Sequence, residues 1–97
     1  MDVTFKDQSL ERLEIDAAFS AGFGGDLVKA YRKAMQHIRS ARDERTFYAR
    51  YSFRFEKLKD DREGQFSMRL NKQWRLIIEL RGDAPRIVHV VEITDYH

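Results

Sequence analysis

Two stretches near the C-terminus, residues 65–70 and 74–80, alternate between apolar and polar side chains, and this alternation restricts the folds open to the chain. The apolar positions on one side are Phe66, Met68 and Leu70 in the first stretch and Trp74, Leu76, Ile78 and Leu80 in the second. A period of two over this length predicts β-strands, and the short polar segment between them predicts a turn. We therefore expect a β-hairpin over residues 65–80.

The opposite side of this hairpin carries Arg75 and Glu79, and also Arg69. Residues 87–93 follow as a third strand that is apolar on both faces, so both of its faces are expected to be at least partly covered. Pro85 lacks an amide donor and is expected to lie outside the ladder, in the loop before this strand. A further short strand is expected at an edge of the sheet over residues 1–6.

Two helices are expected before the hairpin. Asp7 is a candidate N-cap for the first helix, which should end near residues 21–22, where glycines cluster. Asp26 is a candidate cap for the second helix. The apolar stripe of this second helix is Leu27, Tyr31, Ala34, Met35 and Ile38. Helical spacing of this kind is typical of a face buried in a core.

The polar side of the second helix carries a basic face formed by Lys29, Arg32, Lys33 and Arg39. Residues 43–48 are expected to form a brief helical turn, and residues 51–64 a loop with an extended start. The chain is thus predicted to be one α+β domain over residues 1–97, with two N-terminal helices packed on one face of an antiparallel sheet.

Composition excludes several classes of protein. The chain has no cysteine, so it has neither a disulfide framework nor a thiolate metal site. Its three histidines are scattered along the sequence, which gives a zinc site little support. No apolar run reaches membrane-spanning length and the N-terminus does not resemble a secretory signal, so a cytoplasmic protein is expected. A net charge of +2 is only weak support for a polyanionic partner.

The segments FEKLKDDREGQFSMRLNKQWRLII (residues 55–78) and EITDYH (residues 92–97) resemble the HigB-type toxins of the RelE superfamily. The resemblance rests on Leu-Lys-x-Asp-Arg-x-Gly, on Trp-Arg and on the terminal Asp-Tyr-His, taken together. It implies helices against a curved antiparallel sheet, as in RelE-like and ParE-like toxins. It also implies a metal-independent, cofactor-free endoribonuclease that cuts messenger RNA on the translating ribosome. The implied partner is a HigA-like helix-turn-helix antitoxin, through which alone the toxin would meet operator DNA.

Metal-free RNA cleavage needs a base for the ribose 2′-OH, an acid for the leaving 5′-oxygen and fixed positive charge at the phosphate. On the resemblance, Glu56 is the candidate base, although HigB-like relatives often have histidine there. The YoeB-like branch is similar to this chain in having a glutamate followed three residues later by a lysine, here Lys59. His97 is the candidate acid because its unperturbed pKa is near neutrality. Without the resemblance, Glu56 would be a solvated loop residue and His97 a frayed terminus.

Lys59 and Arg75 are expected to bind the scissile phosphate, since a guanidinium fork suits phosphate oxygens and an ammonium supplies a point charge. Arg62 is a secondary candidate for phosphate contact, or equally a partner of a neighbouring acid, Asp61 or Glu63. Tyr96 is expected to stack on a base or to hydrogen-bond the phosphate. RNA contact is further expected of Arg69 and of Asp95, which either orients His97 or caps the last strand.

Two other functions fit the same features. A ParE-like toxin shares this architecture but binds gyrase without cleaving anything, and an inactive homologue would bind only its antitoxin. The basic face of the second helix is either a contact for ribosomal RNA or an ordinary solvated surface.

Overall fold

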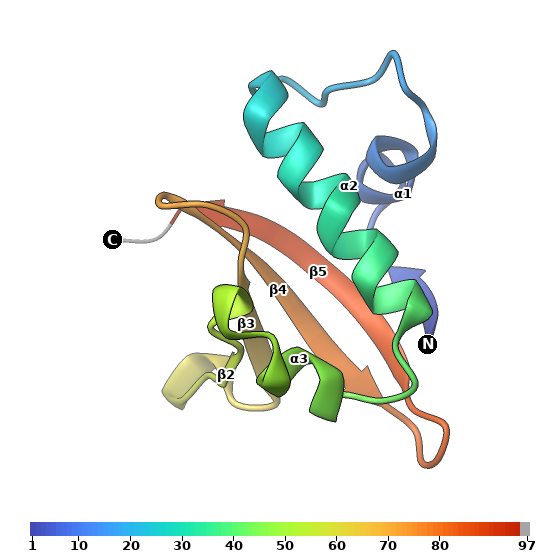
Figure 1. The fold of residues 1–97 in the computed structure, drawn as a ribbon, viewed down its shortest axis with the longest axis vertical. Helices are drawn as coiled ribbons and strands as arrows, with labels where there is room; N and C mark the ends of the chain where they lie inside the picture. The colour runs from blue at the N-terminus through green and yellow to red at the C-terminus, as the bar shows by residue number, and fades with distance from the viewer. Residues whose placement is uncertain (96–97) are drawn as a thin grey trace.

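The computed structural model describes residues 1–95 and forms a five-stranded sheet with helices packed against one face (Figure 1). The strands are β1 (Asp2–Phe5), β2 (Glu56–Lys57), β3 (Gln65–Arg69), β4 (Trp74–Arg81) and β5 (Ile87–Asp95). The helices are α1 (Gln8–Ile15), α2 (Gly25–Ser40), α3 (Arg45–Ala49) and the short 3₁₀ turns η1 (Tyr51–Phe53) and η2 (Asp60–Arg62). The expected α+β class is confirmed.

The predicted hairpin is β3 and β4, and β5 pairs with β4 in the antiparallel sense. The turn between β3 and β4 is closed by Asn71, whose side-chain oxygen accepts hydrogen bonds from the backbone amides of Gln73 and Trp74. Strand β1 lies at an edge as expected, but it runs parallel to β5. The sheet is therefore mixed, and the expectation of an antiparallel sheet is wrong at this one pairing. A parallel pair needs a long crossover, which α1, α2 and the hairpin supply.

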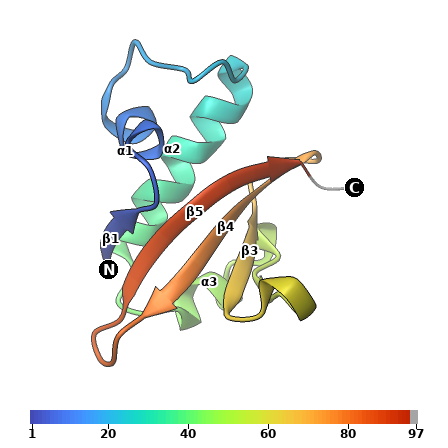
Figure 2. The same ribbon diagram turned by 180° about the vertical axis from the view of Figure 1, so that it is seen from behind.

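Helices α1 and α2 cover one face of the curved sheet, and no α-helix within residues 1–95 covers the other face (Figure 2). All five residues of the predicted apolar stripe of α2 are buried. Among them, Tyr31 donates a hydrogen bond of 2.7 Å from its hydroxyl to the carbonyl of Leu10 on α1. Burial raises the pKa of Tyr31, so this hydroxyl stays protonated and keeps its role as a donor.

The first two helices begin and end at slightly different residues from those expected. Asp7 caps α1 as predicted, by accepting from the amide of Leu10. However, α1 ends at Ile15, because Asp16 leaves helical geometry and accepts from the amide of Ala18 instead. The N-cap of α2 is Gly24, and Asp26 lies in the first turn, where a carboxylate still favours the helix dipole. No helix within residues 1–95 is long and apolar enough to cross a membrane.

The segment before the hairpin has more regular structure than the loop that was expected. Strand β2 pairs with β3, with Glu56 opposite Ser67 and Lys57 opposite Phe66. The stacked rings of Phe55 and Phe66, 5.2 Å apart, hold this short strand against the core. Strand β2 is therefore an edge strand defined by its packing and pairing, and two residues are too few to show a period of their own.

Candidate functional site

The helix-free face of the sheet brings Glu56, Ser67 and Arg75 into one row across three strands. Glu56 on β2 is opposite Ser67 on β3, and Arg75 on β4 lies diagonally from Ser67, two residues from the directly opposite Ile77 and itself opposite Arg69. Arg75 donates from Nη1 to the Ser67 hydroxyl at 3.1 Å, and the same nitrogen lies 3.9 Å from Oε1 of Glu56. The hydrogen bond to Ser67 thus holds the Arg75 guanidinium beside the Glu56 carboxylate, although the two charged residues are more than ten positions apart in sequence.

Burial differs sharply between the two charged groups. The side chain of Arg75 is only 11% exposed, whereas that of Glu56 is 55% exposed. Ser67 is 1% exposed, and its buried hydroxyl accepts the hydrogen bond that orients the Arg75 guanidinium. A half-exposed carboxylate can take a proton from a bound hydroxyl, and the oriented guanidinium beside it can bind an anion at the same time.

Arg69 increases the positive charge at this end of the sheet. It is the direct partner of Arg75, and like charges opposite each other are unfavourable unless an anion lies between them. Its Nε donates to the carbonyl of Asn71 at 3.1 Å. Lys59 lies just beyond β2 with an exposed side chain, and among residues 1–95 it has no ion-pair partner. No described contact joins Lys59 to the Glu56–Arg75 pair.

Arg62 pairs with neither of its sequence neighbours. It donates to Glu92 on β5 at 2.8 Å and to the side chain of Gln65 at 3.0 Å, so the expected partners Asp61 and Glu63 are replaced by a residue 30 positions away. Gln65 in turn donates to Glu79. Hydrogen bonds, from Arg81 above all and then from Gln65, hold the pKa of Glu79 below its usual range. This chain of polar contacts crosses the helix-free face beside the Glu56–Arg75 pair.

Asp95 ends the described part of β5, and its carboxylate accepts a hydrogen bond of 3.0 Å from the side chain of Gln73. This contact ties the end of the last strand to the turn between β3 and β4. Tyr96 and His97 lie outside the described residues, so their predicted roles remain predictions.

The two described histidines lie apart from this row. His89 on β5 has its Nδ1 2.8 Å from the hydroxyl of Thr4, and His37 on α2 makes an edge contact with Phe53. Within residues 1–95, no three His, Asp or Glu side chains are grouped so that they could hold a metal ion.

Two features of the site were missed by the sequence interpretation. Ser67 alternates in the hairpin like any polar strand residue, and nothing local indicates that it orients Arg75. The other feature is the segment RTFYARYSFRF, residues 45–55, in which arginines and aromatic residues alternate without a single carboxylate. Basic and aromatic residues mixed in this way are a signal for nucleic-acid binding that could have been noticed.

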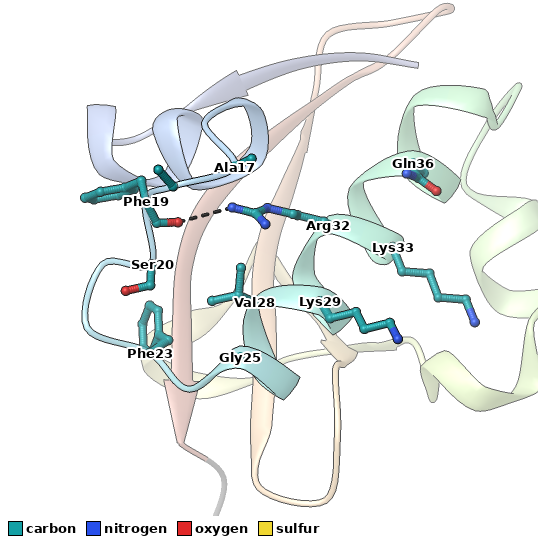
Figure 3. A pocket seen from close by; sticks show the side chains of 11 residues that line it. Ala17, Phe19, Ser20, Phe23, Gly25, Val28, Lys29, Arg32, Lys33 and Gln36 are labelled. Atoms are coloured by element: carbon teal, nitrogen blue, oxygen red, sulfur yellow. Dashed lines mark hydrogen bonds between the residues drawn. The ribbon is translucent and has the colours of Figure 1, made fainter.

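The basic face of α2 is smaller than expected. Arg32 donates to the carbonyls of Leu13, Asp16 and Phe19 and so pins the segment between the helices, as Figure 3 shows for Phe19. Arg39 forms a two-pronged ion pair with Glu14 at 2.8 Å. Among the described residues, the two lysines of this face, Lys29 and Lys33, have neither an ion-pair partner nor a side-chain hydrogen bond. They border an open pocket of about 560 Å³ (Figure 3).

Comparison with solved structures shows which known proteins share this fold. A YoeB/ParE toxin from Agrobacterium tumefaciens superposes with a TM-score of 0.63 at 16% identity, over 100% of both chains. A YoeB–YefM complex from Staphylococcus aureus gives 0.63 at 20% identity, over 100% of this chain and 97% of the other. YafQ from Escherichia coli gives 0.58 at 11% identity, over 97% and 91%. The fold is that of the small α+β toxins.

The sequence narrows this class to a family. Residues 3–97 match the family described as the HigB-like toxins, RelE-like toxins of the type II toxin–antitoxin system HigB. A comparison with curated proteins finds no match. The chain belongs to the HigB-like family of RelE-type toxins, as the terminal motifs predicted.

Proposed function

We propose that this toxin is a metal-independent endoribonuclease that cuts messenger RNA on the translating ribosome and so stops translation. The observation that supports this most directly is the row of Glu56, Ser67 and Arg75 on the helix-free face. It supplies a candidate base and an oriented phosphate ligand within 3.9 Å of each other. A toxin that acts only by binding has no chemical need for such a pair.

The proposed reaction uses the substrate's own 2′-hydroxyl as the nucleophile. Glu56 takes the 2′-OH proton while the 2′-oxygen attacks phosphorus. The P–O5′ bond breaks, and a general acid protonates the departing 5′-oxygen. The products are a 2′,3′-cyclic phosphate and a 5′-hydroxyl end. Arg75 compensates the negative charge that accumulates on the equatorial oxygens, and Ser67 keeps its guanidinium oriented.

The remaining roles follow the family resemblance. His97 acts as the general acid, and Tyr96 stacks on a base or hydrogen-bonds the phosphate. Lys59 is exposed and has no described ion-pair partner, so it is available to a phosphate oxygen. Arg62 must release Glu92 before it can contact RNA, which makes it a weaker candidate than Lys59. Asp95 and Arg69 flank the site, and we assign them to RNA contact.

The proposed partners are the ribosome with its messenger RNA, and a HigA-like helix-turn-helix antitoxin that links the toxin to operator DNA. One similar structure is a toxin–antitoxin complex, YoeB–YefM. A chain of 97 residues offers little surface for a substrate, so the ribosome would supply the positioning and with it much of the rate. This places the proposed activity in the cytoplasm.

Primer extension on a defined mRNA, with and without programmed ribosomes, tests the proposal. We expect cuts that require ribosomes, carry 5′-hydroxyl ends, and fall by about 100-fold or more in Arg75→Ala. Arg81→Ala is the matched control, because Arg81 is an exposed arginine at the far end of the same strand. Intact mRNA together with DNA damage in cells that stop growing would instead indicate a ParE-like gyrase toxin.

A further inference from the structure

Residues 47–55, which lead into β2, form a surface segment that we call the platform. Its buried aromatic residues are Phe47, Phe53 and Phe55. Phe55 makes an edge contact with Phe47 at 5.3 Å and stacks on Phe66 of β3 at 5.2 Å. These contacts fix the backbone against the core, so the residues between them are presented to solvent in a defined arrangement.

The outward residues of this platform are aromatic and basic. Tyr51 is 85% exposed and Tyr48 is 52% exposed, so two aromatic rings of this segment face solvent. Together with Arg50, Arg54 and Phe55 they line a shallow hollow of about 290 Å³. An exposed ring beside guanidinium groups provides a surface on which an unpaired base can stack.

A second, smaller cavity of about 160 Å³ adjoins this hollow through Arg50, between the platform and α2. It is lined by Ala30, Lys33, Ala34, His37, Arg50, Ser52, Phe53, Arg69 and Leu70. None of these residues is acidic. The Nε of Arg50 is buried, yet it has no hydrogen-bond partner in the described protein, and Lys33 has no ion-pair partner there. The guanidinium carbon of Arg50 lies 5.3 Å from the centroid of the Phe53 ring, so a cation–π contact leaves its buried Nε donor available. A buried donor without an acceptor, among several cations and no acid, suits an anionic ligand such as a phosphate group.

The backbone conformation of Arg54 is a separate indication that the platform contacts another molecule. Its φ of 44° and ψ of 47° lie in the left-handed region, where glycine or asparagine is comfortable and arginine is not. The Arg54 side chain is exposed, and no described residue forms a hydrogen bond or ion pair with it. The backbone N–H of Arg54 caps η1 by bonding the Tyr51 carbonyl, but its side chain contributes nothing to this cap. A strained position with an exposed side chain is a candidate for contact with another molecule.

We propose that the platform binds single-stranded RNA, with a phosphate in the Arg50 cavity and a base on the ring of Tyr51. The proposal extends the proposed function, because the platform directly precedes Glu56 in the chain and Arg69 both lines the cavity and is paired with Arg75 across the sheet. RNA on the platform would be the part of the substrate that flanks the cleaved bond. An acidic protein segment would satisfy the arginines but would leave the face of Tyr51 unused, so RNA fits better.

Fluorescence anisotropy tests the platform without relying on cleavage. The probe is a labelled 12-nucleotide single-stranded RNA with 2′-O-methyl groups throughout, which cannot be cut by attack of the 2′-oxygen. We expect Tyr51→Ala to weaken binding by about tenfold through loss of one stacked base. We expect Arg50→Gln to weaken it as well, and to reduce the slope of log affinity against log salt by about 0.7, the value for one lost phosphate contact on a single strand.

Arg54→Gly separates function from folding. Glycine removes the backbone strain, so the melting temperature should be unchanged or higher while RNA affinity falls. Arg12→Ala is the matched control, because Arg12 is an exposed arginine of α1, outside the platform, that is already paired with Asp16 at 3.1 Å. It should bind as the wild type does. A duplex of the same RNA should bind at least tenfold more weakly, since its bases cannot stack on Tyr51.

Two outcomes would overturn the proposal. One is wild-type affinity in both Tyr51→Ala and Arg54→Gly. The other is displacement of the RNA by a deca-glutamate peptide at equal concentration, which would indicate a surface for acidic protein. Failure of the proposed function is distinguishable: in that case Arg75→Ala has no effect on mRNA in the ribosome assay, while the oligonucleotide still binds and still requires Tyr51.

Discussion

Removing the Ser67 hydroxyl should impair catalysis through Arg75, although Ser67 itself touches no substrate. In Ser67→Ala, the Nη1 of Arg75 loses an acceptor at 3.1 Å and keeps Glu56 at 3.9 Å. A hydrogen bond to a charged group contributes about 1.5–3 kcal/mol. Because Glu56 continues to attract the guanidinium, we expect the lower end of that range, which corresponds to a kcat about tenfold lower. The melting temperature should also fall, by about 4–8 °C for each kcal/mol of lost stability.

A second variant separates the hydroxyl from simple packing. Ser67→Thr keeps the oxygen but adds a methyl group at a position that is 1% exposed, which costs about 1–3 kcal/mol of stability. Both variants should be destabilised in urea unfolding, while only Ser67→Ala should lose kcat in the ribosome assay, with KM little changed. Ser40→Ala, at an exposed serine of α2, is the neutral control. Equal kcat in the alanine and threonine variants would refute the reasoning.

Three further predictions follow from other contacts. Tyr31→Phe should lower the free energy of unfolding by about 0.5–1.5 kcal/mol, because it removes a buried hydrogen bond between α2 and a carbonyl of α1; unchanged urea midpoints would contradict this. Glu56→Gln should abolish cleavage and leave stability within about 0.5 kcal/mol, since the carboxylate is half-exposed. Its test is primer extension beside urea unfolding, and retained cleavage would remove Glu56 as the base. The pKa of His37 is lowered by burial and then by Arg50, so NMR titration should find it below 6.5 and raised in Arg50→Ala. Stability should correspondingly decrease as the pH falls from about 6.5 through that lowered pKa, because the unfolded chain binds the proton first.

The sequence alone determined those elements whose signal is local. The alternation around Arg75 predicts two strands, and in a strand the period itself decides which side chains share a face. Asp7 predicts the start of α1 because a cap bonds within its own helix turn. The terminal Asp-Tyr-His and the Leu-Lys-x-Asp-Arg-x-Gly segment predict the family, and the family match over residues 3–97 confirms it. The first two inferences need only residues that are close in the chain, and the third needs only the residue types of short motifs, without their arrangement in space.

Only the tertiary structure decided the features that join distant residues. The parallel pairing of β1 with β5 depends on where the helical crossover returns the chain, and no periodicity records that. Arg62 bonds to Glu92 across the sheet and not to its acidic neighbours, because strand order brings those two side chains together. Glu56, Ser67 and Arg75 likewise become one site through the registers of three strands. A register is selected by burial over a whole sheet face, so the residue types predict the chemistry and the packing decides their arrangement.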